Sequence, residues 1–515
     1  MIIELMAYFS RFTGLLRIAV LKHPKDHAPK PSCNQVPRLN PMIERLESLI
    51  GLSEIKDFHQ AIASRPPKSI RPRIDRSCSI PPFPTTPVPW YPQGLQLLDP
   101  NIRPGGFLEY AAADYYIQDS ASMLPLAMLD IQPDDWICDL CAAPGGKASA
   151  IAENLGPDGF LLANEVISGR LDVLRYALSR TGRANYAICN LDPEPLADAL
   201  AGRFDKVLVD VPCSGQSLLG RKRQSDSSFS ASHVQHCAAR AKRILTSSLG
   251  LVRPGGRLVL STCTFAIEEN EAQIDAILEA YGDSVSTVEF VALKNWESAI
   301  RQGCYRLWPH RDRCAGGFAA AIEVKNAIEP IAKGKIDSRT DRSRSTLKHS
   351  SKPPKSKLNS KLTNSEDLVV SLGQLHIEKN SQKAMWFGYE PGAMRFTNQF
   401  GIQLAQGLRI AQVSADRIEP YLGLAMLASE LFEPAQVLEL DSPSAESFML
   451  GQSLLKDPAI ISTSSTPWCV AKWKGKPLGW LKSASNRWNN YLPTWARFTS
   501  FATNSSSNPD DEPLE

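Results

Sequence analysis

The sequence predicts an α/β protein whose central part folds as a doubly wound parallel sheet. From about residue 136 to 325, apolar segments of strand length alternate with stretches that carry apolar residues at helical spacing. Strands that are apolar throughout are buried on both faces, as in parallel sheets covered by helices on either side. A chain of 515 residues is also long enough for two or three domains.

The expected elements follow one another in strand and helix order. The helix after the second strand has a stop signal in Gly182, because glycine is the usual residue just past a helix end. The four helices are expected in “KASAIAENLG”, “RLDVLRYALSRTG”, “CAARAKRILTSSLGLV” and “EENEAQIDAILEAYG”. The five strands are expected in “WICDL” from Trp136, “FLLANEV” ending at Glu165, “YAIC” before Asp192, “DKVLVDVPCSG” with its strand ending at Asp210, and “RLVLSTCTF”.

A glycine-rich turn, “DLCAAPGGKAS”, joins the first strand to the first helix. It lacks the spacing of a phosphate-binding P-loop, and a proline precedes its two adjacent glycines, Gly145 and Gly146, where a dinucleotide-binding turn has G-x-G-x-x-G. It keeps the feature that both of those loops share. Glycines let backbone N–H groups face a ligand at the carboxyl end of a strand, beside the start of a helix.

The polar residues after each strand are expected at one edge of the sheet, where ligands of doubly wound folds bind. Glu165 lies twenty positions after Gly145, near the spacing at which an acid accepts hydrogen bonds from ribose hydroxyls. An adenosine that carries no phosphates fits such a site, so the predicted cofactor is S-adenosylmethionine. The residues of this edge are Cys141, Ala142, Ala143, Pro144, Gly145, Gly146 and Lys147, then Glu165, Asp192, Asp210, Cys213 and Cys263.

Two cysteines on this edge indicate the chemistry. Cys213 in “DVPCSG” and Cys263 in “STCTF” each stand at a strand end beside a turn. Most free cysteines are simply buried, and either one alone would be read so. Two together favour catalysis, because a thiolate adds readily to electron-poor carbon. Cytosine C5 accepts a methyl group only after a nucleophile adds at C6, so one cysteine can attack and the other can help release the product.

The same motifs carry a resemblance. “DLCAAPGGK”, “DVPCSG” and “STCTFAIEENE” resemble the motifs of the NOL/NOP/Sun family of RNA cytosine-C5 methyltransferases, in the family's order. The resemblance implies a Rossmann-like, S-adenosylmethionine-dependent catalytic domain in which Cys263 is the nucleophile and Cys213 serves product release. It implies that Asp210 is the acid beside the cytosine and that Lys147 approaches it. The implied cofactor contacts are Cys141 to Lys147 with Glu165, Asp192 and Asp210.

The C-terminal part resembles a branch of the family that acts on small-subunit ribosomal RNA and ends in a PUA-like RNA-binding domain. The resemblance lies in “PLGWLKSASNRWNNYLPTWAR”. Its mixture of lysine, arginine and tryptophan suits phosphate contact and base stacking, although tryptophans at this density are equally expected in a core. The predicted partner is small-subunit ribosomal RNA or the assembled small subunit. Transfer RNA as substrate and a non-catalytic RNA-binding assembly factor remain open alternatives.

Composition adds further expectations. Residues 331 to 364 carry ten Lys/Arg against two Asp, as a solvated linker or a phosphate-binding segment would. Eleven thinly spread cysteines and no convincing secretory signal favour a reducing cytoplasm and no metal site. The apolar start is too short and too charged to span a membrane, and a monomer is expected. The predicted divisions are an N-terminal extension (1–36), a small α+β N-terminal region (37–115), the catalytic domain (116–325), a basic flexible linker (326–383), a mixed PUA-like region (384–500) and a disordered tail (501–515).

Overall fold

The computed structural model describes most of the chain between residues 46 and 502. The described residues are 46–76, 80–221, 224, 226–328, 369–371, 375–380, 384–401, 405–414, 417–456 and 466–502. All of them belong to one compact unit, which spans residues 40–515. The predicted N-terminal extension, most of the predicted linker (326–383) and all but two residues of the predicted tail lie outside the described residues. The described part of the predicted linker includes two strands, Val369–Ser371 and His376–Asn380.

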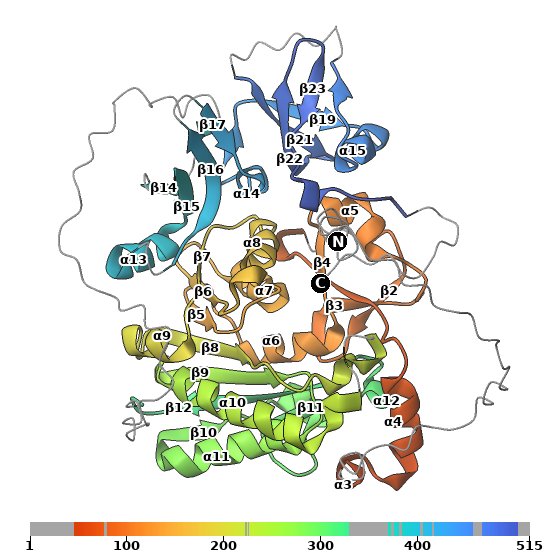
Figure 1. Ribbon diagram of the computed structural model, residues 1–515, viewed down its shortest axis with the longest axis vertical. Helices are drawn as coiled ribbons and strands as arrows, with labels where there is room; N and C mark the ends of the chain where they lie inside the picture. The colour runs from red at the N-terminus through yellow and green to blue at the C-terminus, as the bar shows by residue number, and fades with distance from the viewer. Residues whose placement is uncertain are drawn as a thin grey trace, which may run out of the picture. The chain divides into compact units, whose positions relative to one another are not determined.

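Five parallel strands form the centre of the catalytic domain, as the sequence predicts. Their spatial order is β9-β8-β5-β6-β7 (Figure 1), so the chain starts in the middle and winds outward in both directions. The strands are β5 (Trp136–Asp139), β6 (Phe160–Asn164), β7 (Tyr186–Cys189), β8 (Phe204–Asp210) and β9 (Val252–Thr262). The helices between and after them are α7 (Gly146–Asn154), α8 (Leu171–Ser179), α9 (Pro193–Ala199), α10 (Ala231–Leu249) and α11 (Glu271–Tyr281).

Both faces of this sheet are buried, which explains the apolar runs in the sequence. Side chains alternate between the faces along a strand. In β6, Leu161 packs into the core cluster on one side and Leu162 into the cluster on the other. Each of the five residues of β6 is buried.

Three further strands, which were not predicted from the sequence, make one side of the doubly wound sheet antiparallel. They are β10 (Val285–Thr287), β11 (Cys304–Leu307) and β12 (Gly317–Val324). Strand β12 runs antiparallel to β9, and β10 and β11 run antiparallel to β12. The connection from β10 to β12 contains no crossover helix of the length that a parallel return would need.

The N-terminal region combines a small sheet with short helices, as expected. The four antiparallel strands have the order β2-β3-β1-β4. They are β1 (Ser69–Pro72), β2 (Thr85–Val88), β3 (Tyr91–Leu97) and β4 (Tyr115–Ile117). The helices of this region are α3 (Glu47–Ile50), α4 (Ile55–Ile62) and α5 (Leu108–Ala111), and the catalytic domain adds two further short helices, α6 (Leu124–Leu129) and α12 (Pro309–Asp312).

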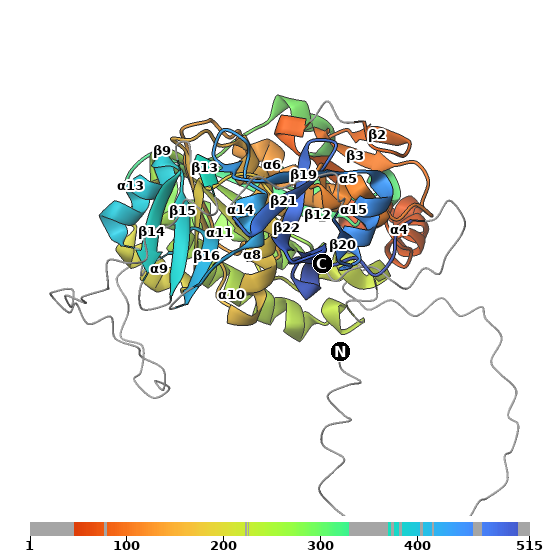
Figure 2. The same cartoon turned by 90° about the horizontal axis from the view of Figure 1, so that it is seen from above.

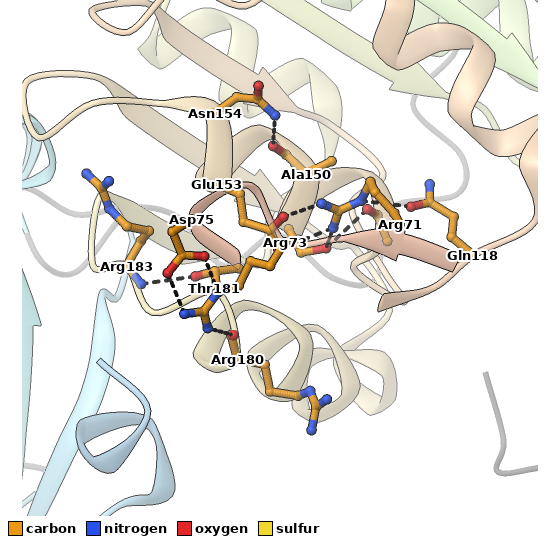
Figure 3. Close-up of polar contacts among 12 residues, drawn as sticks. Arg71, Arg73, Asp75, Gln118, Ala150, Glu153, Asn154, Arg180, Thr181 and Arg183 are labelled. Carbon is orange, nitrogen blue, oxygen red and sulfur yellow. Dashed lines mark hydrogen bonds and ion pairs between the residues drawn. The ribbon is translucent and has the colours of Figure 1, made fainter. Parts of the chain in front are cut away.

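A buried arginine ties this N-terminal sheet to the helix that follows the glycine-rich turn (Figure 3). Arg71 on β1 is 1% exposed and makes a two-pronged ion pair with Glu153 on α7. It also donates to the Ser149 hydroxyl at 2.8 Å and to the side-chain oxygen Oε1 of Gln118 at 3.2 Å. Its charge is therefore fully partnered inside the protein, and β1 and α7 are fixed to one another.

The C-terminal region contains two larger sheets, drawn in teal and blue in Figures 1 and 2. The four-stranded sheet has the order β14-β15-β16-β17 and the five-stranded sheet the order β19-β21-β22-β23-β20. The helices are α13 (Pro391–Phe400), α14 (Leu422–Ala425) and α15 (Ser442–Met449). The strands are β13 (Val369–Ser371), β14 (His376–Asn380), β15 (Met385–Tyr389), β16 (Leu408–Ser414), β17 (Arg417–Pro420), β18 (Glu433–Pro434), β19 (Val437–Leu440), β20 (Leu454–Leu455), β21 (Trp468–Trp473), β22 (Lys476–Ser483) and β23 (Arg487–Asn490).

The four-stranded sheet is packed against the catalytic domain. Glu390 is fully buried and receives two hydrogen bonds from the Arg183 guanidinium, at 3.0 and 2.6 Å. The ring of Phe396 on α13 stacks on Phe160 of β6, with centroids 4.3 Å apart. Removal of the C-terminal region would therefore expose apolar surface of the catalytic sheet. Within the described residues, no helix combines the length and the apolar character needed to cross a membrane.

Candidate active site

The glycine-rich turn lies between β5 and α7, at the carboxyl edge of the sheet. Gly145 has a φ angle of 115°, which favours glycine, and a Cβ atom there would lie 2.4 Å from the Cβ of Ala177 on α8. The Ala142 N–H donates to the Asn164 carbonyl at 2.8 Å and fixes the turn to β6. Burial raises the pKa of the Cys141 thiol, so this cysteine stays protonated in the turn.

Glu165 directly follows β6 and its side chain is turned inward. It is 2% exposed. One carboxylate oxygen accepts from the Ile167 N–H at 2.8 Å, and the other pairs with Arg170 at 3.0 Å. Arg170 also donates to the Ala143 carbonyl at 2.6 Å, so it joins the acid to the turn. Each carboxylate oxygen has a second lone pair, which leaves acceptor capacity for ribose hydroxyls.

Asp192 lies on the same edge, three residues after Cys189, where β7 ends. It is exposed and occupies the position before α9, where its side chain makes no capping hydrogen bond. The family resemblance implies that Asp192 contacts the cofactor, and this contact stays a prediction.

Lys147 and Asp210 form an ion pair at the centre of the edge. The Lys147 ammonium lies 2.7 Å from one oxygen of Asp210, and the Ser261 hydroxyl donates to the other oxygen at 2.7 Å. Burial alone would lower the pKa of Lys147, but Asp210 and nearby Asp139 and Cys263 raise it. Lys147 is therefore a cation, held where α7 begins and aimed at the end of β8.

The two predicted cysteines are in direct contact. The sulfur atoms of Cys213 and Cys263 lie 3.1 Å apart, and the Cys263 N–H donates to the Cys213 sulfur at 3.3 Å. The hydrogen bond to Cys263 and burial raise the pKa of Cys213 well above its ordinary value. Cys213 therefore holds its proton more strongly than a free cysteine does.

Polar contacts between the two cysteine-bearing loops bring the sulfurs together. Glu269, from “FAIEENE”, is fully buried and accepts from the Ser214 N–H at 2.8 Å. The hydroxyls of Ser214 and Thr264 are hydrogen-bonded at 2.7 Å. The Ser217 N–H donates to the Cys263 carbonyl at 3.1 Å. Each residue that follows a cysteine is therefore tied to the opposite loop.

A pocket opens beside this cluster and is lined by Lys147, Asp210 and Cys263. Its outer wall contains an ion pair between Asp119 and Arg221, which lie 2.7 Å apart. The sequence analysis did not single out these two residues. Asp119 belongs to the segment before the first strand and Arg221 to the polar stretch after “DVPCSG”, so neither stands at a strand end.

Comparison with known proteins identifies the family. Residues 126–323 match a family model described as 16S rRNA methyltransferase RsmB/F, and residues 435–498 match one described as the methyltransferase RsmF PUA domain. A protein named ribosomal RNA small subunit methyltransferase F from Vibrio campbellii is 30% identical over 424 residues, 79% of this chain and 85% of its own. The chain belongs to the RsmB/F family. The resemblance drawn from its motifs, the methyltransferase fold and the C-terminal PUA-like domain are thereby confirmed.

Three further similarities were found. The protein of the same name from Escherichia coli O7:K1 is 34% identical over 263 residues, 49% of this chain and 54% of its own. A methyltransferase homolog from Pyrococcus horikoshii has a solved structure that is 28% identical, covers 54% of this chain and 93% of its own, and has a TM-score of 0.48. Another solved structure, NSun6 from Pyrococcus horikoshii with SFG, is 18% identical, covers 55% of this chain and 98% of its own, and has a TM-score of 0.49.

The cofactor of this RsmB/F family member is S-adenosylmethionine, as predicted. The edge of the sheet fits that cofactor in two ways. Glu165 offers acceptor positions for ribose, and Asp139, at the end of β5, offers an acceptor for an amino group. Asp139 is 1% exposed and neither carboxylate oxygen has a side-chain partner among the described residues. Burial, against the attraction of Lys147, raises the pKa of Asp139 to about 7.

Asp139 is a candidate cofactor contact that was not predicted from the sequence. It is the first residue of the motif “DLCAAPGGK”, and an acid that ends a mostly apolar strand was the available signal. Within the described residues, no group of three or more histidine, cysteine or acidic side chains is placed to hold a metal ion.

Proposed function

We propose that this chain methylates C5 of a cytosine in small-subunit ribosomal RNA through a covalent bond between Cys263 and C6. One observation carries the proposal: a pair of touching sulfurs and a lysine–aspartate ion pair meet at one pocket. The sulfurs of Cys213 and Cys263 are 3.1 Å apart, and the Lys147 ammonium is 2.7 Å from Asp210. Lys147, Asp210 and Cys263 all line the same pocket.

The first step is attack by Cys263 on the cytosine ring. Cytosine C5 is a poor nucleophile until a thiolate adds to C6, because the addition moves electron density to C5 and N3. Cys263 is the attacking sulfur in this scheme, since it lines the pocket together with Lys147 and Asp210, whereas Cys213 is not among the lining residues. The Lys147–Asp210 pair supplies a hydrogen-bonded proton where charge develops at N3.

The second step is methylation and release. S-adenosylmethionine supplies an electrophilic methyl group when bound, and Glu165, Asp139 and the turn hold it at the strand edge. The C5 proton must then leave and the bond between Cys263 and C6 must break, which restores the C5–C6 double bond. We assign this release to Cys213, whose sulfur contacts the sulfur of the adduct: its thiol protonates the departing Cys263 sulfur, and the resulting Cys213 thiolate takes the C5 proton.

The choice of RNA rests on the family and on the C-terminal region. The matched family model and the relatives' names refer to 16S or small-subunit ribosomal RNA, and residues 435–498 match a PUA domain of such an enzyme. Small-subunit ribosomal RNA is therefore the proposed substrate, ahead of transfer RNA. The cytoplasmic location and the monomeric state stay predictions.

Labelled S-adenosylmethionine tests this proposal directly. The purified chain is incubated with stripped small subunits, transfer RNA or DNA, and labelled nucleosides are separated after digestion. We expect 5-methylcytosine from small-subunit RNA and none with Cys263→Ala. Label in transfer RNA alone would move the proposal to that substrate. Binding of small-subunit RNA with no label in any nucleic acid would favour a non-catalytic assembly factor.

A further inference from the structure

One tryptophan of the C-terminal region differs from all the others in its exposure. The chain has ten tryptophans, and seven of them are buried core residues. Two more, Trp136 and Trp296, are partly buried. Trp495, in the short turn Thr494–Ala496, is 64% exposed. The sequence analysis left base stacking and core packing open for the C-terminal tryptophans. The structure places Trp473, Trp480 and Trp488 in the core and leaves Trp495 at the surface.

The ring of Trp495 is held by a single aromatic contact. It meets the ring of Tyr176 on α8 at a centroid distance of 5.0 Å and an angle of 75°. An edge-to-face contact of this kind fixes the plane of a ring but uses at most one of its two faces. Tyr176 is itself fixed, because the buried Arg180 donates to its hydroxyl at 3.0 Å and lies over its ring. Trp495 therefore presents an open aromatic face on a rigid support.

Two arginines stand on adjacent elements, Arg175 on α8 and Arg409 on β16. A Cβ atom at Gly423 would lie 3.3 Å from both the Ser179 Cβ of α8 and the Arg409 carbonyl, so the two elements pack together there. Arg175, the residue before Tyr176, has a side chain that is 24% exposed and pairs with Asp172 at 2.9 Å, whose own side chain is 88% exposed. Burial and the charge of Arg409 lower the pKa of Arg175. The buried Nε of Arg409 has no hydrogen-bond partner among the described residues. An anion between the two guanidiniums would satisfy both.

The helix that carries Tyr176 begins beside the proposed cofactor site. Helix α8 starts at Leu171, immediately after Arg170, which contacts both Glu165 and the carbonyl of Ala143 in the turn. At a rise of 1.5 Å per residue, Tyr176 lies about 9 Å from Arg170 along the helix axis.

We propose that Trp495 is a stacking platform for an unpaired nucleotide beside the target cytosine, with the guanidiniums of Arg175 and Arg409 placed for that strand's phosphate. This inference rests on the proposed function, because it takes RNA as the substrate. Open aromatic rings next to arginines are the usual means of holding single-stranded RNA. A nucleotide held there would help to present the flanking base unstacked to Cys263.

Binding measurements without methyl transfer test this inference. The probes are stripped small-subunit RNA and a labelled single-stranded oligocytidine of about 12 nucleotides, within the usual site size. We expect Trp495→Ala to weaken oligocytidine binding about 5- to 100-fold and Trp495→Phe to retain most of it. Leu455→Ala is the matched control, because Leu455 is an equally superficial apolar residue, 84% exposed, in the same region. It should leave the affinity unchanged.

RNA affinity measured at several salt concentrations separates the contribution of the arginine charges from that of the Trp495 ring. Trp495→Ala should keep the wild-type dependence of affinity on salt, whereas Arg175→Ala and Arg409→Ala should each lower the slope by about one. Wild-type affinity in Trp495→Ala would overturn the inference. So would a loss confined to assembled subunits, because the ring would then contact a protein. A chain that binds RNA through Trp495 yet transfers no methyl group would contradict only the proposed function.

Discussion

The sulfur of Cys213 lies 3.1 Å from the sulfur of Cys263 and accepts a hydrogen bond from the Cys263 backbone at 3.3 Å. This contact makes two chemically identical residues unequal. The raised pKa of Cys213 keeps its proton in place, and Cys263 lines the pocket with Lys147 and Asp210, whereas Cys213 is not among the lining residues. Attack and release are therefore assigned to different sulfurs, and substitutions at the site should separate the two.

Asp210 is expected to act before the adduct forms. In a Cys213→Ala background, Asp210→Asn should lower the yield of covalent protein–RNA complex by about 100-fold or more, because the pair with Lys147 that supports charge at N3 is lost. The measurement is denaturing electrophoresis with labelled RNA. Lys206→Gln is a matched control, since it breaks another lysine–aspartate pair of the domain, away from the pocket. Equal yields of the covalent complex with and without Asp210→Asn would show that Asp210 does not support adduct formation.

Glu165 is expected to contribute to cofactor affinity. Glu165→Ala should weaken binding of S-adenosylmethionine about tenfold to a hundredfold, the loss of one charge-assisted interaction. Isothermal titration calorimetry measures the effect. Asp172→Ala removes an acid of the adjoining helix whose side chain is 88% exposed, and should bind as the wild type does. Unchanged affinity in Glu165→Ala would place this acid outside the cofactor site.

Asp139 predicts a pH dependence of folding stability. Its folded-state pKa of about 7 lies above the roughly 3.9 of an unfolded aspartate. Between these values the folded chain holds the extra proton, so this group's contribution to stability is lost as the pH rises through about 7. Asp139→Asn should therefore gain about 3 kcal/mol of stability relative to the wild type as the pH rises from 5 to 7, with little further gain up to pH 8. Urea unfolding measures the difference, and a pH-independent difference would show that Asp139 is ionised throughout.

The Arg71–Glu153 pair predicts a large cost for removing one partner. Glu153→Ala leaves the fully buried guanidinium without its carboxylate, which should lower the free energy of unfolding by about 3 to 5 kcal/mol. The double change Arg71→Met with Glu153→Leu removes both charges and should cost less. Asn154→Ala, on the next residue of α7, removes only a side-chain bond to the Ala150 carbonyl and serves as control (Figure 3). Urea unfolding that shows equal losses for the three variants would contradict a buried charge effect.

Most of the site was predictable because its residues stand at strand ends. The order of apolar strands and helices predicts that Lys147, Glu165, Asp210 and the two cysteines share one edge of the sheet, and the structure places each of them there. The contact between Cys213 and Cys263 was not predictable, since it depends on bonds between two loops fifty residues apart. Asp139 was not predicted, because it lies within the strand β5, whereas the predicted site residues follow the ends of strands.

The C-terminal region shows where composition alone fails. Lysine and tryptophan interleave along β21 and β22, and that pattern is compatible with an RNA-binding face or with a core. The structure buries Trp468 and sets the Lys482 ammonium 4.8 Å from the centre of its ring. The lysines thus cover the edges of a tryptophan core, and only the solvent exposure of Trp495 distinguishes it from its neighbours. Exposure is set by tertiary packing, which no single sequence pattern encodes.

The central claim is that Cys263 attacks C6 and Cys213 releases the product. Its most direct test is denaturing electrophoresis of Cys263→Ala and Cys213→Ala after incubation with small-subunit RNA and S-adenosylmethionine. Cys213→Ala should accumulate a covalent protein–RNA complex, because attack proceeds and release does not. Cys263→Ala should form none, because the bond-forming sulfur is absent. A complex trapped by Cys263→Ala but not by Cys213→Ala would reverse the assignment, and full activity in both variants would contradict the two-cysteine mechanism.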